Sequence, residues 1–240
     1  MSHSAPSMSR DEAIASILAK GSVGPSGKVK KILFGLVAAG LAALVIGLLS
    51  GQPGWWASSL LVATLILAGL SQVGIIWSAI FQITNARWGR SFRRMLELTL
   101  VASPLALLGL LALFVAADAW VPFAHHHLAG SKGVWLSVPF WAVRNFAAVL
   151  ALFGLSVYYL IQCLRPDLGL AKERGKAYPG WLTERLTRNW MGEEAEIAQA
   201  NRRRSVLAPI LCFAYAVVYS MVGFDLIMAL DMEWYSTLFG

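Results

Sequence analysis

Five long runs of apolar residues dominate this chain, and shorter polar or charged stretches separate them. The runs cover Ile32–Leu49, Trp56–Thr84, Leu98–Trp120, Leu136–Cys163 and Ser205–Leu230. A helix rises about 1.5 Å per residue, so about 20 apolar residues cross a hydrocarbon layer about 30 Å thick. Each run has about that length or more. The pattern therefore predicts an all-α, polytopic transmembrane helical bundle with five spans.

The composition of the chain supports this prediction. Hydrophobic residues make up 58% of the 240 residues, charged residues only 14%, and the mean hydropathy is +0.62. Because the interior of a soluble domain of this size cannot cover five such segments, the composition excludes an ordinary water-soluble protein.

The positive charge is confined to one side of the predicted membrane. The net charge is +7, yet all lysines and arginines except Lys132 and Arg144 lie before the first span, between the second and third, or between the fourth and fifth. This skew follows the positive-inside rule, which places the N-terminus and both basic loops in the cytoplasm and the C-terminus outside. A nucleic-acid-binding protein needs a soluble basic face, which this distribution does not provide.

The segments outside the spans carry two further expectations. Residues 1–28 form a polar cytoplasmic tail without the apolar core and cleavage site of a signal peptide, so the first span is expected to remain in the mature protein. In the long loop 164–204, the turn residues Pro179 and Gly180 precede Trp181–Ala200, where apolar residues recur at helical spacing. This segment is read as an amphipathic helix on the membrane surface or against a cytoplasmic partner, with a solvated connector as the open alternative.

Two charged residues fall inside predicted spans. Arg144 lies about 12 Å below the outer start of span four and Asp225 about 9 Å below the outer end of span five, by helical rise. Their depths nearly match, so we expect them to approach each other in one bundle. Either they form a structural ion pair between two helices, or they contact quinone or handle protons, because charges inside membranes often mark functional pathways.

Other polar residues extend this set of candidates. Asn145 is adjacent to the buried arginine, and Asp118 near the outer end of span three is most simply a solvated interfacial acid. Gln72 lies deep in span two, where it either extends a polar track or bonds a neighbouring helix. Glu97 follows two arginines and is read as an interfacial salt-bridge partner.

Residue types that bind redox cofactors are sparse. His125, His126 and His127 form a run in the outer loop, where they are either titrating interfacial groups or a proton exit near quinol. The spans contain no histidine for haem ligation. Cys163 and Cys212 do not form a ligand set for an iron–sulfur centre and are read as small apolar core residues.

Several strings within Trp56–Gly240 together indicate a family. They are SAIFQITNARWGRSFRR (Ser78–Arg94), FWAVRNF (Phe140–Phe146), the histidine run and GFDLIMALDMEWYSTLFG (Gly223–Gly240). The chain resembles the second large membrane subunit of bacterial alternative complex III, within the polysulfide-reductase-type (NrfD-like) family of quinone-interacting membrane proteins.

The resemblance implies a fold as well. Members of this kind have about ten spans in two four-helix bundles. Spans two to five, within 52–240, would form the first bundle, and 29–51 would be a peripheral transmembrane helix. The resemblance thus covers the N-terminal half of such a protein. We expect either a fragment or a split protein whose other spans come from a second polypeptide.

The resemblance also implies a function, that of an integral membrane subunit, not catalytic alone, of a respiratory quinol:cytochrome c oxidoreductase in the bacterial inner membrane. This chain would bind no cofactor or metal. Electrons from quinol or menaquinol would pass to iron–sulfur and haem c groups on partner subunits, beside a second NrfD-like subunit. Arg144, Asp225 and the histidines map onto polar positions of a quinol-proximal bundle or proton path. From the residue types alone, Phe140, Trp141, Phe224 and Met228 either line a quinol cleft beside them or pack in the helix core.

Two other functions fit the same residues. In one half of a proton or solute transporter, Arg144 and Asp225 would gate a pathway. Transporters often break their helices at midplane, whereas Pro104, Pro139 and Pro209 lie near span ends. The third function is a cofactor-free scaffold that assembles redox subunits through the basic loop and the C-terminal segment.

Overall fold

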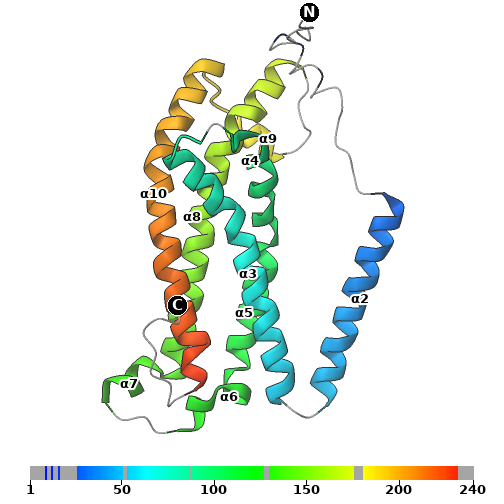
Figure 1. Cartoon of the computed structure of the whole chain (residues 1–240), viewed down its shortest axis with the longest axis vertical. Helices are drawn as coiled ribbons and strands as arrows, with labels where there is room; N and C mark the ends of the chain where they lie inside the picture. The colour runs from blue at the N-terminus through cyan, green and yellow to red at the C-terminus, as the bar shows by residue number, and fades with distance from the viewer. Residues whose placement is uncertain are drawn as a thin grey trace, which may run out of the picture.

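The fold is a bundle of long helices. The computed structural model describes residues 9, 12, 16, 26–50, 53–86, 88–126, 130–175 and 181–231. Within these ranges all regular structure is helical, and five helices are long and apolar enough to cross a membrane (Figure 1). The prediction of an all-α membrane bundle with five spans is confirmed.

The elements follow one another along the chain with short connections. They are α2 (Gly27–Leu49), α3 (Pro53–Ile83), α4 (Arg90–Glu97), η1 (Leu98–Ala102), α5 (Ser103–Val115), α6 (Ala117–Trp120), η2 (Pro122–His125), α7 (Gly130–Trp135), α8 (Val138–Glu173), α9 (Trp181–Leu186), α10 (Glu193–Leu226) and η3 (Met228–Leu230).

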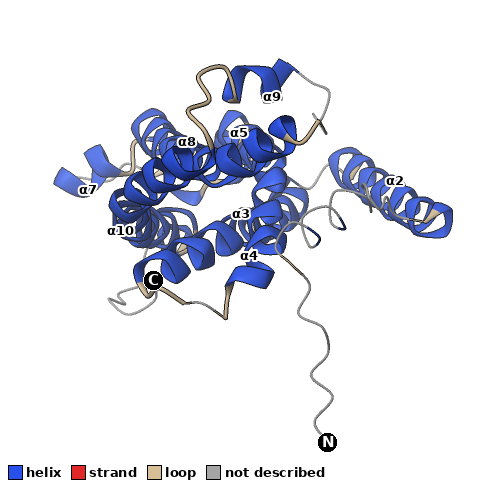
Figure 2. Ribbon diagram, turned by 90° about the horizontal axis from the view of Figure 1, so that it is seen from above, coloured by secondary structure: helices blue, strands red, loops and turns tan. Residues whose placement is uncertain are grey.

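Four of the long helices form the bundle and the fifth stands apart. In the end-on view of Figure 2, α3, α5, α8 and α10 surround a common core, and contacts join α10 to α8, α8 to α5, α5 to α3 and α3 to α10. Helix α2 packs only loosely beside α3, and none of its apolar window is buried. Span one is therefore peripheral, as the sequence predicts.

The bundle is apolar outside as well as inside. Large side chains such as Phe34, Val115 and Phe213 are more than 70% exposed. A soluble protein would bury such residues, whereas a membrane-embedded helix presents them to lipid. The hydrophobic core is divided between one end, around Trp141 and Leu226, and the other, around Tyr159.

The expected inner loop Asn85–Glu97 is partly helical, which corrects the sequence interpretation. From Arg90 the chain forms α4 and then continues through η1 into α5. Exposed apolar residues of α4, Phe92 and Met95, point away from the bundle, while Glu97 on the opposite face is buried. The third candidate membrane span therefore runs from Phe92 to Val115 and begins earlier than Leu98, the start expected from the apolar run.

The prediction of one helix over Trp181–Ala200 is wrong. Helix α9 ends at Leu186, and Gly192 then has a φ of +94°, a conformation that interrupts a helix. A Cβ on Gly169 would lie 1.9 Å from the ring of Trp190, so this glycine lets Trp190 pack on α8. Helices α8 and α10 extend into the expected loop 164–204, and Pro209 consequently lies inside α10.

Candidate functional site

Asp225 forms the centre of a polar cluster where α8 begins and α10 ends, which we call the Asp225 end. Its Oδ2 accepts hydrogen bonds from Arg144 Nη2 at 2.6 Å, Arg144 Nε at 3.2 Å and Asn145 Nδ2 at 2.8 Å. Its Oδ1 accepts one from Trp135 Nε1 at 3.2 Å. The predicted contact between Arg144 and Asp225 is confirmed, and Asn145 belongs to the same cluster.

Two aromatic rings lie against the Arg144 guanidinium of this ion pair. The Arg144 guanidinium carbon lies 3.8 Å from the ring centroid of Trp135 and 4.8 Å from that of Phe140, and Nη1 donates to the Trp135 carbonyl at 3.0 Å. An acid near a helix C-terminus opposes the helix dipole, so the adjacent guanidinium offsets an unfavourable position. Trp141 Nε1 donates to the Asp225 carbonyl at 2.8 Å, which satisfies one terminal carbonyl of α10.

A mainly apolar groove of about 660 Å³ opens beside this cluster. Its lining consists of Trp135, Ala216, Val217, Ser220, Met221, Phe224 and Asp225. Of the four side chains expected to line a quinol cleft, Phe224 does so. Trp141 is instead completely buried in the core, and Phe140 covers Arg144. The groove combines an apolar wall with one carboxylate, a lining that suits an amphipathic ring.

Gln72 lies in the middle of the bundle, away from Asp225. Its Oε1 accepts a hydrogen bond from Ser156 Oγ on α8 at 2.9 Å, so it joins two helices. Along α8, Ser156 lies about 16 Å from Asn145 by helical rise, and the buried residues between them are apolar. Within the described residues, Gln72 is thus not part of a continuous polar track to Asp225.

Three buried polar atoms of the described residues have no hydrogen-bond partner. They are Gln72 Nε2, Asn145 Oδ1 and the Tyr219 hydroxyl. Buried polar atoms of this kind are places where internal water binds, because an unpaired group in an apolar interior is costly.

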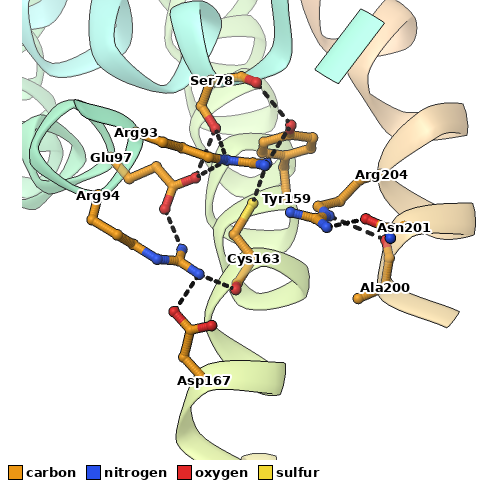
Figure 3. Close-up of polar contacts among 10 residues, drawn as sticks. All are labelled: Ser78, Arg93, Arg94, Glu97, Tyr159, Cys163, Asp167, Ala200, Asn201 and Arg204. Carbon is orange, nitrogen blue, oxygen red and sulfur yellow. Dashed lines mark hydrogen bonds and ion pairs between the residues drawn. The ribbon is translucent and has the colours of Figure 1, made fainter. Parts of the chain in front are cut away.

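A second polar cluster surrounds Glu97 where the end of α4 packs against the C-terminal part of α3, and we call it the Glu97 end (Figure 3). The carboxylate is buried and lies between two arginines of its own helix. Arg93 Nε donates to Oε1 at 2.9 Å, and Arg94 Nη1 donates to Oε2. Ser78 Oγ on α3 also donates to Oε1, at 2.7 Å. The prediction that Glu97 forms a salt bridge is confirmed, and its carboxylate is buried within the protein.

The two arginines connect α4 to α8. Arg93 Nη2 donates to the Tyr159 hydroxyl and to Cys163 Sγ, each at 3.2 Å. Arg94 Nη2 donates to the Cys163 carbonyl at 2.6 Å and to Asp167 Oδ2 at 2.5 Å (Figure 3). Cys163 is buried in the core, as expected, but also contacts a cation. Arg93 and Glu97 are spaced i, i+4 among apolar residues that are exposed. This spacing is the sequence signal that could have indicated an ion pair buried within the protein.

A further ion pair joins α8 to α10. Arg165 on α8 donates from Nε at 2.8 Å and from Nη2 at 2.7 Å to the two carboxylate oxygens of Glu196 on α10. Arg165 also donates to the Asn189 carbonyl at 3.0 Å. The sequence interpretation treated this segment as a loop, so it missed the pair; charge alone does not identify partners 31 residues apart.

The remaining candidates lie at the surface near the Asp225 end. Asp118 is exposed on α6, as expected for a solvated acid, and its carbonyl lies 2.8 Å from His125 Nε2. His126 is exposed, whereas His127 lies outside the described residues. The hydrogen bonds described for Asp118 and His125 do not reach Asp225, so the structure does not join them to the central cluster.

In the part of the chain that the structure describes, no three His, Cys, Asp or Glu side chains are grouped to hold a metal ion. What the site offers chemically is an ion pair, amide and indole donors, and an apolar groove. A comparison of the chain with protein-family models, with curated proteins and with solved structures finds no match in any of the three.

Proposed function

We propose that this protein is an integral membrane subunit of a respiratory quinol:cytochrome c oxidoreductase and that its Asp225 end faces quinol. One observation carries the proposal: a buried Arg144–Asp225 ion pair, 2.6 Å between Nη2 and Oδ2, adjoins an apolar groove of about 660 Å³. Quinols enter from lipid, and their sites need an apolar wall with a few polar groups.

The hydrogen bonds of Asp225 leave room for a ligand. Its Oδ2 accepts three hydrogen bonds, whereas Oδ1 accepts one, from Trp135. Since each carboxylate oxygen can accept about two, Oδ1 keeps a position for a quinol hydroxyl. The ring of that quinol would lie against Phe224 and Met221, and Ser220 would supply a second polar contact.

The chemistry would be shared with partner subunits. Oxidation of a quinol releases two electrons and two protons; here Asp225 would accept a hydroxyl proton, and the electrons would leave through iron–sulfur and haem c groups on other chains. A second NrfD-like subunit would lie beside this chain in the membrane part. This assignment rests on the resemblance of the sequence strings together with the groove.

The charge distribution supports an orientation for this subunit. The basic segments cluster at the Glu97 end and in the N-terminal region, so these would face the cytoplasm of a bacterial inner membrane. The Asp225 end would then face outward, toward the partner that receives the electrons, and the protons from quinol would be released on that side.

Purification from the native membrane in mild detergent tests the assignment to a complex. Mass spectrometry is expected to identify iron–sulfur, haem c and second NrfD-like subunits, and a redox spectrum is expected to show haem c. A colourless preparation without these partners would overturn the proposal and favour half of a proton or solute transporter instead.

Variants of the purified complex test the site itself. Asp225→Asn is expected to slow quinol turnover by about 100-fold, the typical contribution of a general base, with the complex still assembled. Ser220→Trp, which fills the groove, is expected to raise KM for quinol more than it lowers kcat. Asp118→Asn is the matched control because Asp118 is exposed. Normal turnover in Asp225→Asn would refute the quinol role, and loss of assembly would indicate a purely structural ion pair.

A further inference from the structure

A second concave site lies at the Glu97 end and has no part in the proposed quinol chemistry. It is a pocket of about 470 Å³ between the end of α3, the turn into α4 and the N-terminal part of α10. Its polar lining consists of Gln82, Asn85, Arg93, Asn201, Arg204 and Ser205. A pocket with two arginines and four neutral polar side chains, without a carboxylate in its lining, is suited to an anion.

The two guanidinium groups keep donors available for a ligand. The hydrogen bonds described for Arg93 use Nε and Nη2, and those of Arg204 also use Nε and Nη2. Among the described residues, each Nη1 is therefore without a partner. Two guanidinium groups that face one cavity match the geometry of phosphate oxygens, which guanidinium binds with paired hydrogen bonds.

One nearby carboxylate is bonded to a lining arginine, and the other nearby carboxylates are held by other residues or are distant. Glu97 is paired with Arg93 and Arg94, and Glu196 is held by Arg165. Glu194 lies seven residues before Asn201 on α10, which corresponds to about 10 Å of helical rise. Glu97 therefore offsets part of the charge of Arg93, but among the described residues Arg204 is in no ion pair, so the lining keeps a net positive charge.

The position of the pocket indicates which anion it meets. Gln82 Nε2 and Ser205 Oγ lie 3.4 Å apart and join α3 to α10 at the pocket, and the next residues, Ile83 and Val206, are 50% and 60% exposed. The exposed apolar surface of both helices thus ends beside the pocket. That boundary is the depth at which lipid headgroups lie, and basic pockets between membrane helices bind such headgroups.

We propose that this pocket binds the phosphodiester headgroup of an anionic phospholipid, with Arg93 and Arg204 on the phosphate and the acyl chains along α3 and α10. Arg204 is the residue to vary, because Arg93 also holds Glu97. Arg202, two positions away on the same helix, is exposed and does not line the pocket, so it supplies a matched control of equal charge.

The full-length chain in nonionic detergent is titrated with three probes: phosphatidylglycerol, phosphatidylcholine with the same acyl chains, and inorganic phosphate. Bound lipid is counted by native mass spectrometry, and the unfolding temperature is followed by tryptophan fluorescence. Phosphatidylglycerol is expected to bind and raise the unfolding temperature, and the other two probes are expected to have little effect. Arg204→Gln is expected to weaken phosphatidylglycerol binding about tenfold, the loss of one charge-assisted hydrogen bond, while Arg202→Gln binds normally.

Three results would overturn the proposal. Equal stabilisation by phosphatidylcholine would mean that acyl chains alone are bound. Stabilisation by inorganic phosphate alone would assign the pocket to a soluble anion. Equal losses in Arg204→Gln and Arg202→Gln would mean that net charge matters and the pocket does not. Arg204→Lys guards against misfolding, because it keeps the charge and is expected to retain part of the preference for phosphatidylglycerol.

Discussion

Each end of the bundle contains a carboxylate buried among apolar helices, but the arginines that neutralise the two carboxylates come from different places in the chain. At the Glu97 end, the acid and its two main cations lie within five residues on one short helix, Arg90–Glu97. At the Asp225 end, the acid and its cation are 81 residues apart, on α10 and α8. The first cluster is local in sequence, and the second exists only when two long helices pack.

Because of this difference, the two clusters stabilise the protein in different ways. Glu97 pairs with two arginines of its own helix, and the same arginines bond α8. Asp225 instead joins the end of α10 to the start of α8 through Arg144. The guanidinium of Arg144 also makes cation–π contacts with the rings of Trp135 and Phe140. We infer that loss of Glu97 harms the protein more than loss of Asp225, because Glu97 accepts from two guanidinium groups, of which only Arg94 keeps another carboxylate, the exposed Asp167.

Glu97→Ala should therefore be the most damaging change. Removal of one member of a buried ion pair costs about 3–5 kcal/mol, and the loss of a partner for two arginines at once places this variant near the upper value. The free energy of unfolding is measured by addition of sodium dodecyl sulfate to mixed micelles. Glu194→Ala, an exposed acid on α10, is the control and should change stability little. A Glu97→Ala variant as stable as this control would show that the network contributes nothing.

Asp225→Ala should destabilise by less, about 3 kcal/mol, because Arg144 retains its rings and the Trp135 carbonyl. The double variant Arg144→Met, Asp225→Ala completes a cycle, and it should recover part of the loss since no charge is left unpaired. The same unfolding measurement on all four proteins gives the coupling energy. A coupling energy of zero would contradict the view that this pair joins α8 to α10.

The sequence predicts the parts of the structure that the membrane itself dictates. Lipid requires apolar helix surfaces, so the five spans follow from hydropathy, and a fixed helical rise places Arg144 opposite Asp225 by depth alone. Both predictions are confirmed by the helices and by the ion pair. The roles of these residues toward quinol or protons stay predictions.

Outside the apolar runs, hydropathy and helical rise do not predict where the helices begin and end. The continuation of α8 to Glu173 and the start of α10 at Glu193 depend on the Arg165–Glu196 pair and on the packing of Trp190 over Gly169. Such contacts are tertiary, so local periodicity wrongly favoured one surface helix. Polar segments near a membrane can be solvated or buried in protein, and hydropathy does not distinguish these cases.

Gly74→Ala tests whether the Glu97 end depends on close packing as well as on charge. A Cβ on Gly74 would lie 1.9 Å from the Leu96 carbonyl oxygen, so α3 and α4 would have to separate. Overpacking of this kind costs about 2 kcal/mol. Hydrogen exchange should increase in α4 and leave the start of α8 unchanged. Gly69→Ala on the same helix meets no atom within 4 Å and should behave like the unmodified protein. Equal effects at both ends would contradict independent stabilisation of the two clusters.

Asp167→Asn should have the smallest effect and thereby define where the Glu97 cluster ends. Asp167 is paired with Arg94 at 2.5 Å, but its side chain is 61% exposed, against 2% for Glu97. Exposed ion pairs contribute at most about 1 kcal/mol because water and salt screen them. The free energy of unfolding should therefore fall by less than about 1 kcal/mol, and less still at high salt. A loss as large as that in Glu97→Ala would mean that Asp167 is the acid on which Arg94 depends, and the cluster would then be anchored on α8 and not on α4.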